Sequence, residues 1–222
     1  MTEASKVGAM ARFLATILGL PWIEILAEAA KLASKMFHTL AYEGTYEVLE
    51  QECTLELLDR GGKKARFTKR KKVRYLQNET IAHQDYGWAD GKYFLNYQVS
   101  PGVAVDRYKA GYKHYVLISL REIKNRGDVD EFHIQWQLQN AFLKPDGFWQ
   151  TDIPTITKYL KINILFPASR PPESVRLVEN NIRRASILNS DSIKKLQDGR
   201  WKVTWETTKP RLYEQYVLRW DW

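Results

Sequence analysis

Two pairs of histidine and aspartate are the first candidates for catalytic chemistry in this sequence. One residue separates His83 from Asp85, and two residues separate Asp130 from His133. In an extended strand His83 and Asp85 would project from the same face. A nucleic-acid-processing enzyme with one of these pairs in its site is therefore one hypothesis. A catalytic metal would need about three converging side chains, which neither pair supplies, so we expect no metal and no cofactor.

The single cysteine indicates the compartment, and the missing catalytic motifs argue against an enzyme. Cys53 has no partner for an internal disulfide, which is typical of a reducing compartment and predicts a cytoplasmic protein. The chain has no Gly-rich phosphate loop, no GxSxG turn and no HExxH helix. We therefore expect a protein that binds a partner without transforming it.

The densest charge lies in residues 63–74, where eight of twelve side chains are basic. Such a run is a common mark of contact with nucleic acid or an anionic membrane, and the whole chain has a net charge of +8. However, the preceding segment is acidic, and Arg60-Gly61-Gly62 between the two predicts a hairpin loop. The two segments therefore have to be compared residue by residue.

Placing Asp59 opposite Lys63 fixes the register of this predicted hairpin. Apolar residues then oppose one another on one face, where Leu57 meets Ala65, Leu55 meets Phe67 and Leu49 meets Val73. Opposite charges meet on the other face, with Glu56 facing Arg66, Glu52 facing Arg70 and Glu50 facing Lys72. Each such pair contributes about 0.2–1 kcal/mol, so many of the cations already have a structural role.

Five cations remain after this pairing, and we predict that they bind an anionic partner. Lys69 and Lys71 share the face of Cys53 and Gln51, and Cys53 is expected to be buried there. The complete predicted anion-binding set is Lys63, Lys64, Lys69, Lys71 and Arg74.

Alternation of apolar and polar residues recurs throughout residues 41–222 and indicates strands. Residues 190–196 are expected to form one short helix. About ten strands joined by short turns predict a mainly β domain, an antiparallel β-sandwich or barrel. The expected strands are 45–58, 64–76, 93–99, 114–123, 132–138, 160–166, 175–179, 182–188, 201–205 and 216–222.

Residues 1–40 have a different, apolar pattern. Gly19 and Pro21 separate two helical segments, which predicts an N-terminal helical hairpin. Each segment is shorter than the about 20 apolar residues that span a membrane. The hairpin is expected either to pack against protein, including a second copy of the chain, or to lie in a membrane. The residues predicted to make this contact are Phe13, Leu14, Ile17, Trp22 and Leu26.

A helical hairpin followed by a β domain favours a non-enzymatic binding or sensor module. Residues 7–37 would mediate self-association or docking to another protein, and the 63–74 strand would contact an anionic membrane or nucleic acid. The alternative is a membrane-active effector whose N-terminal helices insert into the bilayer. The expected location is cytoplasmic, with membrane association possible.

Overall fold

A computed structural model describes residues 44–222, and the predicted N-terminal hairpin of residues 1–40, with its five contact residues, lies outside them. The described part contains fourteen strands and one short 3-10 helix, Ser190–Ser192. The strands are β1 Tyr46–Leu57, β2 Lys64–Tyr75, β3 Thr80–Gly87, β4 Lys92–Ser100, β5 Val103–Ala110, β6 Lys113–Lys124, β7 Val129–Gln139, β8 Asp146–Asp152, β9 Leu160–Phe166, β10 Ser174–Glu179, β11 Arg184–Ile187, β12 Ile193–Lys195, β13 Trp201–Thr207 and β14 Gln215–Asp221.

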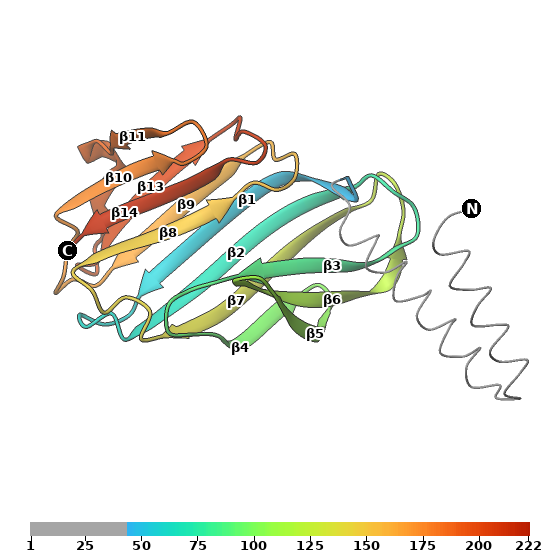
Figure 1. The fold of residues 1–222 in the computed structure, drawn as a ribbon, viewed down its shortest axis with the longest axis horizontal. Coiled ribbons are helices and arrows are strands. Elements are labelled where there is room, and N and C mark those ends of the chain that lie inside the picture. The colour runs from blue at the N-terminus through green and yellow to red at the C-terminus, as the bar shows by residue number, and fades with distance from the viewer. Residues whose placement is uncertain (1–43) are drawn as a thin grey trace, which may run out of the picture. The chain divides into compact units, whose positions relative to one another are not determined.

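The strands form one large sheet and two small ones (Figure 1). The large sheet has seven strands in the order β12-β13-β9-β1-β2-β7-β4. The four-stranded sheet has the order β11-β10-β14-β8, and the three-stranded sheet has the order β3-β6-β5. Each small sheet packs against a different part of the large one, as aromatic contacts show. Trp205 of β13 contacts Tyr216 of β14, whereas His83 of β3 stacks on Phe132 of β7.

The mainly β class is confirmed, and several details of the predicted fold differ from the structure. The sheets are open rather than closed into a barrel, with β12 and β4 at the free edges of the large one. The sandwich is also not wholly antiparallel, because β1 and β9 pair in parallel. Residues 190–196 form the short 3-10 helix followed by β12, instead of one helix. Residues 80–87, 103–110 and 146–152 form strands that the alternation did not indicate.

The β1–β2 hairpin forms in the predicted register over most of its length. Glu56 is opposite Arg66, Glu52 is opposite Arg70 and Glu50 is opposite Lys72. The register shifts between Val48 and Glu50, so that Val48 rather than Leu49 opposes Val73. An extra residue on one strand is a β-bulge, which locally bends and twists the hairpin.

The loop of this hairpin is tied to another loop by a close backbone approach. Gly62 has a φ of +66°, and a Cβ atom there would lie 1.8 Å from the carbonyl oxygen of Phe142. The amide of Phe142 donates to the carbonyl of Gly62 at 3.2 Å. Only glycine fits this position, and it holds residues 140–144 against the end of the hairpin.

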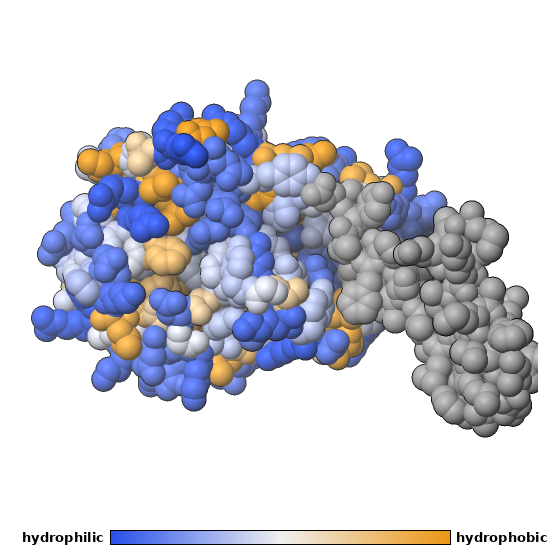
Figure 2. All heavy atoms as spheres, viewed as in Figure 1, coloured by the Kyte–Doolittle hydropathy of each residue, from blue (hydrophilic) through white to orange (hydrophobic). Residues whose placement is uncertain are grey.

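The described residues contain no helix that is long and apolar enough to cross a membrane. Residues 43–222 form one compact unit. Figure 2 shows that the visible surface of this unit is mainly hydrophilic, with apolar side chains in small scattered groups. A large exposed apolar patch would indicate a docking surface, and this face has none.

Candidate functional site: a cavity between the sheets

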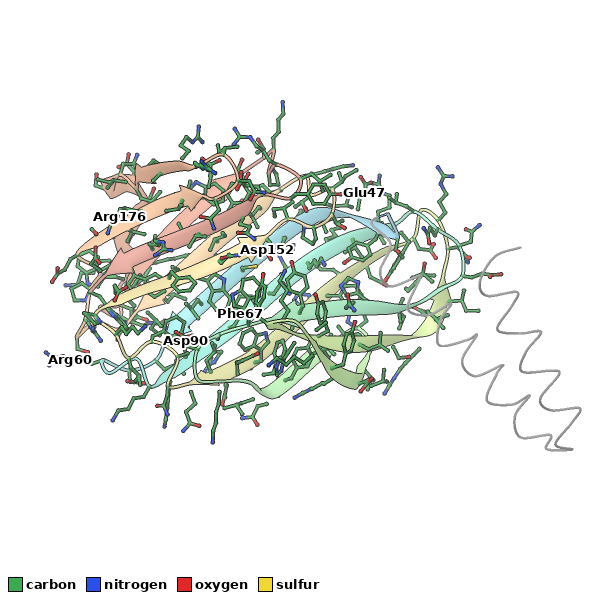
Figure 3. All side chains as sticks on the ribbon, in the orientation of Figure 1. Glu47, Arg60, Phe67, Asp90, Asp152 and Arg176 are labelled. Carbon is green, nitrogen blue, oxygen red and sulfur yellow. The ribbon has the colours of Figure 1, made fainter. Side chains whose placement is uncertain are left out.

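A cavity of about 290 Å³ lies between the large sheet and the adjoining parts of the two small sheets. Its floor comes from β1, β2 and β7, and its sides come from the end of β3, from β8 and from residues 140–144. Phe67, Asp90 and Asp152, which are labelled in Figure 3, all line it. The lining runs from buried residues such as Phe67 to exposed ones such as Asp90 and Leu143, so the cavity opens to solvent at one end.

Three aromatic rings form an apolar wall of the cavity. The ring centroid of Phe67 lies 4.9 Å from that of Trp136 and 4.7 Å from that of Trp149. All three residues are at most 9% exposed. Aromatic surfaces of this kind bury large apolar areas, so this wall suits a hydrophobic ligand.

Polar side chains gather at the buried end, and we call Tyr46, Gln51, Cys53, Lys69, Lys71 and Asp85 the inner cluster. Within it, the Lys69 ammonium pairs with the Asp85 carboxylate. The hydroxyl of Tyr97 donates to the other oxygen of Asp85 at 3.0 Å. Burial opposes the charge of Lys69, yet the adjacent Asp85 carboxylate raises the pKa of Lys69 above its usual value. The charge of Lys69 is therefore retained inside the fold.

Lys71 lies in the same cluster but has a different environment. Its Nζ atom donates to the hydroxyl of Tyr46 at 3.1 Å and lies 4.7 Å from the centroid of that ring. No carboxylate oxygen of residues 44–222 lies within 4.0 Å of it. Lys71 is a buried residue with 9% exposure, and its ammonium group has no counter-ion in the described part of the chain.

Cys53 is buried, as predicted, with 2% exposure. Gln51 donates to its sulfur at 3.6 Å. Burial raises the pKa of the Cys53 thiol to about 11, although Lys69 beside it acts in the opposite direction. A thiol with such a pKa is neutral at neutral pH and is a poor nucleophile.

The two predicted histidine and aspartate pairs do not form acid–base pairs. His83 is buried between the rings of Tyr46 and Phe132, at centroid distances of 4.8 and 4.3 Å. Neither of its ring nitrogens has a hydrogen-bond partner among residues 44–222. Burial holds the pKa of His83 well below its usual value, whereas Asp85 binds Lys69 and Tyr97 instead of orienting the imidazole.

Asp130 and His133 point to opposite faces of β7. Asp130 is buried, where it accepts hydrogen bonds from Tyr75 at 2.8 Å and from Lys124 at 2.8 Å. The side chain of His133 is 61% exposed and lies 3.2 Å from Glu131. Asp130 and His133 are three positions apart, and residues an odd number of positions apart on a strand point to opposite faces of the sheet.

The predicted anion-binding set is divided between different surfaces. Lys63 and Lys64 are exposed at the hairpin loop. Arg74 is exposed too, but it pairs with Glu47 at 3.1 Å. Lys69 and Lys71 face inward and line the cavity. The five cations therefore do not form one external patch.

A cluster of aromatic rings around Lys113 lies beside the cavity, and sequence reasoning missed it. The Nζ atom of Lys113 lies 4.7, 5.1 and 5.6 Å from the ring centroids of Tyr86, Trp88 and Tyr112. It also donates to Asp152 at 2.7 Å. This contact joins β6 of the three-stranded sheet to β8 of the four-stranded sheet. Aromatic residues on separate strands give no recognisable spacing in the sequence.

The Lys69–Asp85 pair was not predicted either, although the sequence did indicate the position of Lys69. The predicted register placed Lys69 on the face of Cys53 and Phe67, and a lysine on an apolar face needs a buried partner. The partner comes from β3 in another sheet, which no local pattern indicates. Within residues 44–222, no group of three or more His, Cys, Asp and Glu side chains could hold a metal ion.

Comparison with known proteins identifies a shared fold at low sequence identity. No family model and no curated protein matches the sequence. The structure is similar to that of a proposed protease from Parabacteroides distasonis, with a TM-score of 0.50 and 9% identity over 82% of this chain. It is also similar to a proposed nutrient-binding protein from Legionella pneumophila, with a TM-score of 0.51 and 8% identity over 81% of this chain. The matched regions span 41% and 68% of those proteins, and at such identities the likeness shows the fold alone.

Proposed function

We propose that this protein is a non-enzymatic binding or sensor module that holds a small, largely apolar molecule between its sheets. The observation that carries the proposal is the solvent-connected cavity of about 290 Å³ with the wall of Phe67, Trp136 and Trp149. This volume is close to the lower end of the roughly 300–1,000 Å³ that is typical of small-molecule sites. Concave sites lined mainly by apolar and aromatic side chains, with a few polar groups, are where small molecules usually bind.

The groups around the cavity favour binding over catalysis. The Cys53 thiol is neutral at neutral pH because its pKa is about 11. His83 is held between two rings without a hydrogen-bond partner in residues 44–222. A nucleophile next to an oriented base would favour an enzyme, and the described lining has no such arrangement. Assembly or membrane contact through residues 7–37, and polyanion contact through Lys63 and Lys64, remain separate predictions.

Tryptophan fluorescence tests the proposal directly, because Trp88, Trp136 and Trp149 all line the cavity. The full chain would be titrated with 1-decanol, decanoate and decylamine, and complexes would be counted by native mass spectrometry. We expect saturable fluorescence changes and one bound molecule per chain for at least the alcohol. If none of the three binds, the proposal is wrong.

A cavity-filling variant locates the binding. Thr151 is buried on β8 and lines the cavity, so Thr151→Phe should occupy the ligand's space and weaken decanol binding at least tenfold. Thr208→Phe makes the same exchange at an exposed position outside the lining and should leave binding unchanged. Equal binding to both variants would place the ligand elsewhere and contradict the proposal.

A further inference from the structure

Lys71 is a buried residue whose charge has no counter-ion among residues 44–222. The inner cluster contains two ammonium groups, those of Lys69 and Lys71, and one carboxylate, that of Asp85. Asp85 already binds Lys69 and accepts from Tyr97. Cys53 adds no negative charge and His83 adds no positive charge, because burial favours their neutral forms. One positive charge is therefore left without a counter-ion among residues 44–222.

An isolated buried charge is costly, so a fold normally pairs it or leaves a place for its partner. The ammonium group of Lys71 can donate three hydrogen bonds, and the Tyr46 hydroxyl accepts one of them. Lys71 lines the cavity and is nine-tenths buried. The adjacent Gln51 also lines the cavity, and within residues 44–222 its amide donates only to the weak acceptor Cys53 Sγ. Uncommitted donors thus lie next to a positive charge.

The rest of the lining has the opposite character. The aromatic wall of Phe67, Trp136 and Trp149 offers no charge. The carboxylate of Asp152 is already paired with Lys113, and the acidic side chains Asp90 and Asp146 are exposed at the solvent end. Water screens charges at such positions. The cavity therefore has a buried cationic end and an apolar middle.

We infer that the ligand is an amphiphilic anion, an apolar body with a carboxylate that pairs with Lys71 and takes a hydrogen bond from Gln51. This inference rests on the proposed function and adds the chemical class of the ligand. A carboxylate supplies the missing negative charge and accepts charge-assisted hydrogen bonds from both donors, whereas an alcohol of equal length supplies no charge. An alkylammonium would place a second unpaired cation beside Lys71.

The comparison of head groups at constant chain length tests the inference on the wild-type full chain. We expect decanoate to bind at least tenfold more tightly than 1-decanol, because a hydrogen bond to a charged group changes an equilibrium constant by roughly one to two decades. Decylamine should bind most weakly. Equal affinities for decanoate and decanol would overturn the inference and leave the proposed function standing, whereas binding of no amphiphile would contradict the function itself.

Two lysine variants on β2 give the matched control. Lys71→Met keeps the length of the side chain, removes its charge, and should weaken decanoate at least tenfold with little change for decanol. Lys72→Met, on the adjacent residue and the opposite face of the strand, should change neither affinity. If Lys71→Met retains wild-type affinity for decanoate, Lys71 does not hold the head group.

A stability measurement distinguishes this role from a structural one. A lysine retained for a ligand destabilises the empty fold, so Lys71→Met should raise the thermal midpoint of the ligand-free protein. Decanoate should then stabilise the wild type more than the variant. A lower midpoint for ligand-free Lys71→Met, with undiminished stabilisation by decanoate, would assign Lys71 to the fold. If Lys71→Met does not fold, Lys71→Arg should keep the preference for decanoate over decanol, and loss of that preference would count against the inference.

Discussion

At the scale of single residues, burial decides what each cation does. Lys69 and Lys71 are two positions apart on the same face of β2, yet one has a carboxylate partner and the other has none in the described chain. Removing one member of a buried pair leaves an uncompensated charge, which is much worse than removing both. The Lys69–Asp85 pair is therefore expected to be essential to folding, whereas the outward-facing cations contribute little individually.

Asp85→Asn tests this expectation. The amide keeps the shape of the side chain and can still accept from Tyr97, but it leaves Lys69 without a counter-ion, so the free energy of unfolding should fall by about 3–5 kcal/mol. The double variant Lys69→Met/Asp85→Asn should recover most of this loss. Urea unfolding of the wild type, of Lys69→Met, of Asp85→Asn and of the double variant gives the coupling free energy between the two side chains. Additive losses would show that the pair is not coupled.

The same pair predicts a pH dependence. Asp85 raises the pKa of Lys69 above the ordinary value of 10.5, so the stabilisation is complete below that value and is lost as the pH rises through the higher, folded-state pKa. The difference in stability between wild type and Asp85→Asn should therefore be constant near neutrality and shrink in strongly alkaline solution. A difference that grows with alkaline pH would contradict this assignment.

At the scale of elements, the sequence determined the hairpin better than anything else in the fold. The acidic strand and the basic strand select one register, and Glu56, Glu52 and Glu50 occupy the predicted places. The bulge at Leu49 was not predictable, because the parallel neighbour β9 contacts β1 from more than a hundred positions along the chain. Burial of Lys69 was not predictable for the same reason, because its partner Asp85 comes from β3 in the three-stranded sheet. The cavity arises between sheets, so no single strand contains its signal.

Lys113 joins two elements, and this gives a prediction about the small sheets. Its contact with Asp152 connects β6 to β8, and the rings of Tyr86, Trp88 and Tyr112 surround it. Lys113→Met keeps the stem between the rings but removes the ion pair. Amide protection from hydrogen exchange should then decrease in β3 and β6 and stay unchanged in β10 and β11, neither of which pairs with β8. A uniform decrease across both small sheets would mean that the pair stabilises the whole fold and does not specifically join the two sheets.

At the scale of the whole molecule, the apolar core and the proposed site belong to one unit. The buried hydrophobic residues of the described structure form one cluster that draws on all three sheets, and residues 43–222 are compact as a unit. The inner cluster, the aromatic wall and the Lys113 contacts all lie within it. Ligand binding and the predicted assembly through residues 7–37 are therefore separable properties, because a domain with its own core can fold independently.

A comparison of the full chain with residues 43–222 tests this separation. The shorter chain should unfold cooperatively at nearly the same temperature and bind 1-decanol and decanoate with unchanged affinities, because it retains every residue of 44–222 that lines the cavity. Light scattering after size exclusion should detect any change in oligomeric state, and flotation with anionic vesicles should detect any change in membrane binding. If residues 7–37 mediate assembly, the shorter chain should form particles with fewer subunits than the full chain. If they contact lipid, the shorter chain should lose only its flotation with vesicles. Loss of decanol binding in a folded shorter chain would mean that residues 1–42 contribute to the site, and the cavity alone would then be insufficient for binding.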